Sequence, residues 1–442
     1  MAAAQGTTLG SLGKLTELRQ RIFFLIGALI VFRLGSFIPV PGVNPEAMTS
    51  LVEGGGGLLN MVNMFSGGSL SRFSVFALGV VPYISASIVV QMMGSVIPSL
   101  QALRKEGEAG RRKMTTYTRF GTVGLAAFQA FGIAVALQKQ VAAGGAPVVY
   151  MPGAGFVLAS VVGLTAGTMF LMWLGEQITS RGIGNGISLI ILSGIVAELP
   201  AALANMLELG RQGAMSTGLI LVVIVMAVAV IAFIVFMERA QRRLLIQYPK
   251  RQVGNKMFEG QSSHLPLKLN TSGVIPPIFA SSLLLLPTTV ANFNAGSGPE
   301  WFQWITTQLG HGRPLFLILY LALIVFFAFF YTAIVFNPTE TADNLKKHGG
   351  FIPGIRPGEG TAEYIDYVLS RITVLGAIYL AIVCLIPEIL ISYASVPFYF
   401  GGTSLLIVVS VTMDTVAQVQ GYLLAHQYEG LIRKSKLRGR RR

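Results

Sequence analysis

The sequence "NMFSGGSLSRFSVFALGVVPYISAS", residues 63–87, places a short apolar piece and a double glycine directly before a long apolar run. In residues 58–66, apolar side chains recur on one face of a predicted helix and asparagines on the other. A helix of roughly nine residues reaches about 14 Å, less than half of a bilayer's hydrocarbon core. The stretch therefore predicts a helix too short to span a membrane, followed by one that does span it.

The composition predicts an all-α polytopic membrane protein. Hydrophobic residues make up 53% of the 442 residues and charged residues only 12%, about half the charged share of a soluble protein. Apolar runs near 20 residues, enough to cross a bilayer, recur along the chain. The ten predicted spans are residues 22–37, 74–97, 119–137, 155–176, 187–206, 216–236, 273–292, 314–336, 371–390 and 402–421.

The basic residues set the predicted orientation. With the N-terminus in the cytoplasm, all but five of the 33 lysines and arginines fall in cytoplasmic segments, as the positive-inside rule requires. Ten spans then return the C-terminus to the cytoplasm as well. Arg33 lies within the first span, near its outer end, where its side chain can snorkel to the interface. The other exceptions, on the opposite side, are Arg72, Lys139, Arg211 and Arg313.

The sequence predicts neither an enzyme nor a cofactor. Cys384 is the single cysteine, the four histidines show no metal-ligand spacing, and no Walker loop or nucleophile elbow occurs. The first 20 residues lack the apolar core of a removable signal peptide. Asp414, inside the tenth span, is the one acid that suggests a proton relay, and a structural role is the favoured interpretation.

Two cytoplasmic loops, about 238–272 and 337–370, are longer than orientation alone requires. In the second, Gly and Pro on both sides of Arg356 predict a tight hairpin tip. The loops could supply orienting charge and attract anionic lipids, or they could dock RNA or an acidic partner. Their length favours docking. The candidate docking residues are Arg239, Arg242, Arg243, Lys250, Arg251, Lys256 and Arg356.

Five spans per half predict an inverted repeat, with halves at residues 1–210 and 211–442, and such repeats place working sites at mid-membrane. "GVVPYISAS" (79–87) and "GVIPPIFAS" (273–281) match at six of nine positions, and "GISLII" (186–191) resembles "GTSLLI" (402–407). These matches nominate a collar of branched aliphatic side chains, although ordinary core residues would look similar. The collar residues are Val80, Ile84, Ile187, Ile191, Ile278 and Ile407.

The short helix has two interpretations. Glycines on both sides give its backbone freedom, which suits a movable plug beside the collar. A helix resting on the outer leaflet would show the same amphipathic pattern. The candidate plug, about 58–71, includes Leu58, Leu59, Met61, Val62, Met64, Phe65, Gly67 and Gly68.

Several motifs resemble the SecY family of protein-conducting channels from end to end. They include "EGEAGRRKMTTYTR", "GIGNGISLII", "HLPLKLNTSGVIPPIFASS" and "NPTETADNLKKHGGFIPGIRPGEGTAEYID". The resemblance covers about residues 14–436 and implies two inverted five-helix halves around an hourglass pore in the bacterial cytoplasmic membrane. It also implies that the collar is a pore ring, that 58–71 is a plug, and that spans two and three open laterally against spans seven and eight.

The resemblance further implies the partners SecE, SecG, SecA, the ribosome and polypeptides with signal sequences. Val80 departs from the family's usual isoleucine, which removes one methylene from the ring. Weak polar contacts suit helices that must separate, and the candidate gate residues are Ser85, Ser87, Gln91, Ser281 and Ser282. A proton-coupled transporter would share the repeat, but it requires ionisable groups facing one another at mid-membrane, where these residues are aliphatic.

Overall fold

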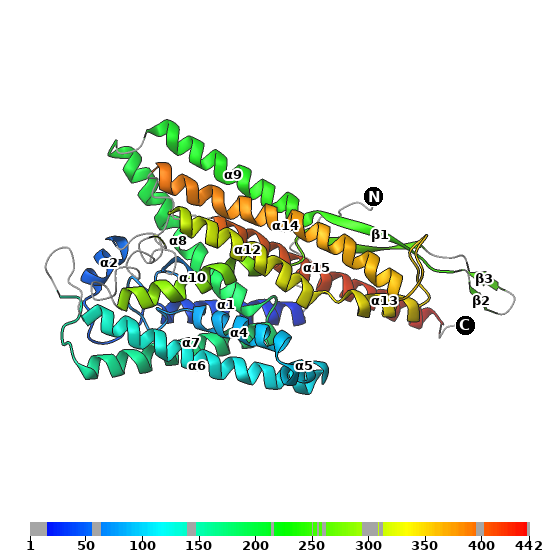
Figure 1. Ribbon diagram of the computed structural model, residues 1–442, viewed down its shortest axis with the longest axis horizontal. Helices are drawn as coiled ribbons and strands as arrows, with labels where there is room; N and C mark the ends of the chain where they lie inside the picture. The colour runs from blue at the N-terminus through cyan, green and yellow to red at the C-terminus, as the bar shows by residue number, and fades with distance from the viewer. Residues whose placement is uncertain are drawn as a thin grey trace. The chain divides into compact units, whose positions relative to one another are not determined.

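The computed structural model describes residues 16–54, 63–138, 147–213, 216–249, 251–253, 256–258, 262–293, 308, 313–394 and 402–439. Helices dominate these residues (Figure 1). The chain divides into two compact units. One comprises Met1–Asn205, Leu285–Thr306 and Val411–Arg442, and the other comprises Met206–Leu284 and Thr307–Ser410.

Most helices belong to one unit, while α8 (Gly186–Arg211), α10 (Ile275–Phe293) and α15 (Gly402–Gly439) contribute residues to both. The first unit contains α1 (Thr16–Gly35), α2 (Pro45–Gly54), α4 (Val81–Val96), α5 (Pro98–Lys105), α6 (Glu108–Gln138) and α7 (Ala154–Arg181). The second contains α9 (Thr217–Arg239), α12 (Pro314–Val335), α13 (Pro338–Lys347) and α14 (Glu359–Ala394).

The helices confirm the all-helical polytopic class. Each predicted span coincides with one helix, namely α1, α4, α6, α7, α8, α9, α10, α12, α14 or α15. Among the described residues, seven helices are long and apolar enough to cross a membrane, and two shorter apolar helices cover Val81–Val96 and Ile275–Leu284. The helices α6, α14 and α15 continue well beyond the predicted spans, at the ends where the sequence turns polar.

The second span starts later than predicted, at Val81 instead of residue 74. Gly79 has a positive φ of 56°, which a continuous right-handed helix does not allow, and Pro82 lies in the first turn, where proline is favoured. Val80 is therefore the N-cap residue, the last residue of the turn that precedes α4. Its carbonyl still accepts the first helical hydrogen bond, from the Ile84 amide at 3.0 Å.

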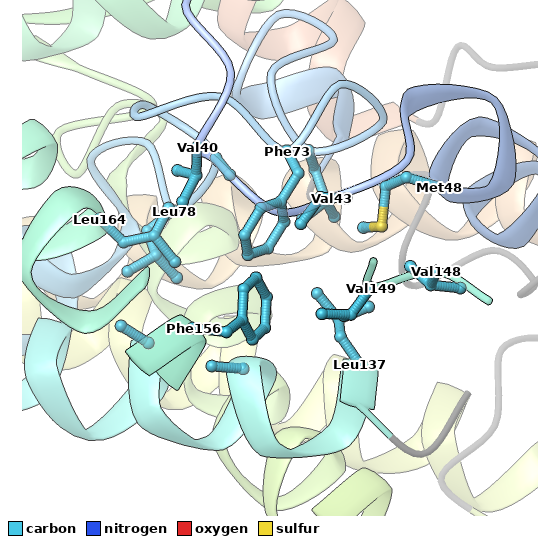
Figure 2. Close-up of a cluster of buried hydrophobic side chains, with 14 of the residues drawn as sticks. Val40, Val43, Met48, Phe73, Leu78, Leu137, Val148, Val149, Phe156 and Leu164 are labelled. Carbon is cyan, nitrogen blue, oxygen red and sulfur yellow. The ribbon is translucent and has the colours of Figure 1, made fainter. Parts of the chain in front are cut away.

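The first unit has a continuous apolar core beneath the segment that joins α1 to α4 (Figure 2). Phe73 is fully buried there and packs with Phe156 of α7, while Val149 packs beside Leu137 of α6. Phe73 has a positive φ of 44°, unusual for a residue with a side chain. Its amide and carbonyl are both hydrogen bonded, to Leu70 and Val40, so the surrounding structure holds this conformation.

The loop after α9 forms β-structure that the sequence analysis did not predict. Strand β1 (Gln241–Gln247) pairs antiparallel with β4 (Ser262–Lys268), and β2 (Arg251–Val253) pairs with β3 (Lys256–Phe258) toward the far end (Figure 1). Leu244 and Ile246 are buried and alternate with exposed neighbours, which is the pattern of a half-buried strand. The sequence does not show this alternation, because exposed Leu245 between them is apolar as well.

Candidate functional site

Two consecutive glycines shape the turn that follows residues 63–66. Gly67 and Gly68 both have positive φ, 66° and 78°, a conformation that L side chains rarely adopt. The Gly68 amide donates to the Asn63 carbonyl at 2.8 Å, and the Asn63 side-chain oxygen accepts from the Ser71 amide at 2.8 Å. These buried glycines form a closed, hydrogen-bonded turn and not a loose hinge, which corrects the expectation of backbone freedom at this end.

Arg33 of α1 binds this turn directly. Its Nη1 donates to the Gly67 carbonyl at 2.6 Å, and its guanidinium lies over the Phe37 ring, 5.2 Å from the centroid. Arg72 approaches the same ring at 4.3 Å, and Arg33 also lies within electrostatic range of Arg72 and Glu198. Arg33 therefore does not simply snorkel to the interface: it makes a charge-assisted hydrogen bond, the stronger kind, to the double-glycine turn.

Helix α8 forms the other wall of the turn. A Cβ on Gly194 would lie 3.0 Å from the Phe65 carbonyl oxygen and 3.1 Å from the Gly67 nitrogen, and a Cβ on Gly68 would clash with the Glu198 carboxylate. Glycine at position 194 lets the α8 backbone approach the turn more closely than most side chains allow, and glycine at position 68 leaves room for the Glu198 carboxylate. The turn is thus held between α1 and the part of α8 that belongs to the first unit.

The candidate plug is only partly within the described residues. Leu58, Leu59, Met61 and Val62 lie outside them. Met64 is buried and Phe65 is half-buried. Ser66 lies close to the start of α4, since a Cβ added to Gly79 would be 3.6 Å from the Cβ of Ser66. The described end of the candidate plug therefore lies against the start of the helix that carries Ile84.

The candidate collar residues are placed within their own units. In the first unit, Val80, Ile84 and Ile191 are buried, and half-buried Ile187 packs against Gly175 of α7. In the second unit, Ile278 lies in the first turns of α10, and Ile407 near the start of α15 is fully buried. All six positions carry aliphatic side chains on helices or, for Val80, at a helix N-cap.

The candidate gate residues make local hydrogen bonds. In α4, the Gln91 amide donates to the Ser87 hydroxyl at 3.0 Å, and Ser85 is buried with no side-chain hydrogen bond to the described residues. In α10, Ser281 donates to the Ile278 carbonyl at 2.9 Å, and Ser282 is buried beside it. Such bonds stay within one helix, so they would not hold two helices together.

The two long loops form one folded body. Gln247 of β1 and Phe351 exchange backbone hydrogen bonds of 2.9 and 3.0 Å. Beneath this bridge, buried Leu244 and Leu267 of the ribbon pack with Ile365 of α14. We call this body, residues 241–268 and 351–372, the ribbon platform. The pairing of the two loops was not predicted, because no local sequence pattern indicates it.

Arg356 lies exposed at the predicted hairpin tip. Gly354 and Gly358 on either side have positive φ values of 82° and 108°, and the Arg356 carbonyl accepts a hydrogen bond from the Thr361 hydroxyl at 2.9 Å. Arg242 and Arg243 are exposed on β1, Arg239 ends α9, and Arg251 and Lys256 lie on β2 and β3. Lys250 lies outside the described residues. Apart from Arg239, the described basic residues thus lie on the ribbon and at the tip of one platform.

Comparison with known proteins identifies the family. The SecY family model matches residues 74–416, which include the helix that carries Ile84 and the whole ribbon platform. The chain is 55% identical over 429 residues to the protein translocase subunit SecY of Escherichia coli K12, covering 97% of this chain and 96% of that protein. This chain belongs to the SecY family.

Other SecY proteins are similarly close. The subunit of Vibrio cholerae is 55% identical over 430 residues, covering 96% of both chains, and that of Rickettsia felis is 54% identical over 423 residues, covering 96% of this chain and 97% of the relative. Among solved structures, a protein-conducting channel matches with a TM-score of 0.66 at 16% identity, covering 93% of this chain and 96% of that one. Sec61 in a canine ribosome–channel complex matches with a TM-score of 0.65 at 16% identity and the same coverage.

Proposed function

We propose that this protein passes unfolded secretory polypeptides across the bacterial cytoplasmic membrane and releases transmembrane segments sideways into lipid. It is a multi-pass SecY-family translocase subunit and acts as a channel, not as an enzyme. The observation that carries the proposal is the 55% sequence identity to the Escherichia coli translocase subunit SecY over 97% of this chain. We also propose that the two repeat halves are residues 1–210 and 211–442, with both termini cytoplasmic.

The proposed pore ring consists of the six aliphatic collar residues. A channel for polypeptide must pass any sequence yet leak few ions when empty, and a hydrophobic constriction resists ions by dewetting. Branched aliphatic side chains offer no charge or carbonyl that would hold one residue of the moving chain. The burial of Ile84, Ile191 and Ile407 supports their place inside the helix bundle.

The proposed plug, about 58–71, closes the ring from the outer side at rest. The bond from Arg33 to Gly67 and the contact with Gly194 support an anchored resting state. Opening requires the anchor to break, and one hydrogen bond to a charged group contributes on the order of 1.5–3 kcal/mol. An arriving polypeptide can supply that much free energy by burying apolar surface.

The proposed lateral gate lies along α4 and α10, where apolar segments leave for lipid while polar segments continue across. The intrahelical hydrogen bonds of Ser87, Gln91 and Ser281 support a surface that separates at small cost. SecE and SecG are the proposed accompanying subunits, with anionic lipids at the basic loops.

The ribbon platform is the proposed docking surface for SecA or a ribosome. Exposed arginines on β1 and at the hairpin tip support an acidic or nucleic-acid partner. The structural match to Sec61 in a ribosome–channel complex agrees with this choice. Signal-bearing polypeptides would then arrive from a motor held at this platform.

A cross-linking experiment tests the proposed channel. Cys384 is the only cysteine and is buried, so Cys384→Ser provides a background for a single cysteine at Ile278. A secretory chain stalled halfway through membranes that contain the protein and SecE should cross-link to position 278. A cysteine at Phe236, 70% exposed on α9, serves as the control and should stay unlinked. Absence of the link at 278, with proton-driven uptake of a small solute, would indicate a transporter.

Replacing Ile278 or Ile407 by asparagine should loosen gating, because a buried amide without a partner costs about 1–3 kcal/mol and admits water to the constriction. We expect both variants to export substrates with defective signal sequences. Ile234→Asn is the matched control, since Ile234 is fully buried on α9 outside the ring. Substrate discrimination that stays normal in both ring variants would overturn the assignment.

A further inference from the structure

A buried polar network joins the end of α9 to the start of α10. The Asn270 side-chain nitrogen donates to Glu238 Oε1 at 2.6 Å and to the Gly273 carbonyl at 3.0 Å, and the Ser272 hydroxyl donates to Asn270 Oδ1 at 3.1 Å. Asn270 and Ser272 are each only 4% exposed. Both N–H groups of the amide and one lone pair of its oxygen are therefore in use.

The position of this network connects two parts of the second unit. Asn270 follows the end of β4 by two residues, and α10 begins two residues after Gly273, with Ile278 in its first turns. The Leu269 amide also donates to the Ala240 carbonyl at 3.0 Å, next to Glu238. The six residues from 269 to 274 are thus the whole connection between the ribbon platform and α10.

This connection has little room to move independently. A Cβ on Gly376 of α14 would lie only 2.7 Å from the Leu269 carbonyl oxygen, so the segment packs directly against α14. Gly273 turns the chain with a φ of 63° before α10. A displacement of β4 would therefore reach α10 through this short turn, which the bond to Glu238 ties to α9.

The chemistry of the pair suits a bond that forms and breaks. Glu238 offers a carboxylate and Asn270 a neutral amide, so the bond is charge-assisted on one side only. A salt bridge buried at the same place would be strongly destabilising to separate. A carboxylate–amide pair exchanges one hydrogen bond for hydration at modest cost.

We propose that Asn270 and Glu238 form a clasp that keeps α10 in its closed position until a motor displaces the ribbon platform. In this proposal, which rests on the proposed channel function, Asn270 is a positioning residue: it contacts no substrate and acts through the orientation of α10. Movement of β4 pulls residues 269–273 away from Glu238 and frees the first turns of α10, which carry Ile278.

Three variants test the clasp. Asn270→Ala removes both donated bonds, and Asn270→Asp places a second carboxylate against Glu238. We expect each to raise motor-dependent export of a substrate with a defective signal sequence on the order of tenfold, the effect of losing one such bond. Combining Asn270→Asp with Glu238→Gln reverses donor and acceptor between these two residues but leaves the Gly273 carbonyl without its donor. It should therefore lower export of that substrate well below the level of Asn270→Asp alone.

Controls separate the clasp from general damage. Thr271→Ala removes a neighbouring hydroxyl that donates to the Lys268 carbonyl and should leave gating unchanged. A merely structural role for Asn270 would lower export of normal substrates without admitting defective ones. That result, or a swapped pair that exports the defective substrate as well as Asn270→Asp alone does, would overturn the clasp. Loss of normal export by the wild-type protein itself would instead overturn the channel function.

One measurement applies even if the Asn270 variants accumulate poorly. Glu238→Gln keeps the shape of the side chain and an acceptor oxygen but weakens the bond from Asn270. We expect this variant, without a motor, to show a several-fold higher resting ion leak in reconstituted vesicles. A leak equal to that of wild type would contradict the clasp.

Discussion

Replacing Arg33 by glutamine is expected to release the double-glycine turn and make the resting channel leak ions. The Arg33 guanidinium donates to the Gly67 carbonyl at 2.6 Å in a partly buried site. Loss of a hydrogen bond from a charged donor costs about 1.5–3 kcal/mol, which shifts the balance between anchored and released turn roughly 10- to 150-fold. Ion conductance of the purified channel in vesicles, without a motor or substrate, measures the shift.

Two substitutions serve as controls for Arg33→Gln. Arg33→Lys keeps the charge and one donor but loses the planar fork, so it should leak less than the glutamine variant. Arg19→Gln removes an exposed charge from the same helix and should not change conductance. Equal conductance of Arg33→Gln and the wild-type protein would show that the Gly67 bond does not hold the turn.

Reversing the charge of Arg356 is expected to abolish most translocation while the channel still inserts into the membrane. Arg356 is exposed between two left-handed glycines, so a glutamate there leaves the backbone of the tip unchanged. Arginines at the centre of an interface contribute on the order of 2–4 kcal/mol when truncated, and a charge reversal adds repulsion. We expect motor affinity to fall at least roughly 30-fold, measured on reconstituted membranes together with export.

The matched control for Arg356→Glu is Lys347→Glu. Lys347 is exposed on α13 in the same polar segment, so its reversal changes the net charge equally. We expect that variant to bind the motor within a few-fold of wild type. An equal loss in both variants would mean that long-range attraction, which salt screens, accounts for docking. Normal export by Arg356→Glu would show that Arg356 has no role in docking the motor.

For Arg33, the sequence correctly placed a single arginine in the first span, but its contact in the folded protein differs from the predicted one. The sequence places a single arginine near the outer end of an apolar span, and snorkelling is the ordinary outcome for such a residue. Its partner is a backbone carbonyl 34 residues later in the chain, at Gly67. No side-chain pattern identifies a carbonyl acceptor, because every residue has one.

The ribbon platform shows a second kind of limit. Its strands β1 and β4 pair residues that are 15 or more positions apart, and its bridge to Phe351 joins segments separated by over a hundred positions. Cross-strand pairing depends on neighbours in space, so intrinsic strand propensity is a weak guide to it. The Arg356 tip, in contrast, was predictable, because proline fixes φ and glycine permits positive φ regardless of distant contacts.

By itself, the sequence predicted a helix at each of the ten proposed spans, the all-helical class, the SecY resemblance and the hairpin tip at Arg356. Each of these depends on apolar length, on charge or on local backbone restrictions, all of which are properties of neighbouring residues. Only the tertiary structure decided that Arg33 and Gly194 hold the double-glycine turn, that two loops form one platform, and that Asn270 binds Glu238. Those contacts join residues far apart in the chain, and a sequence pattern does not encode the distance between them.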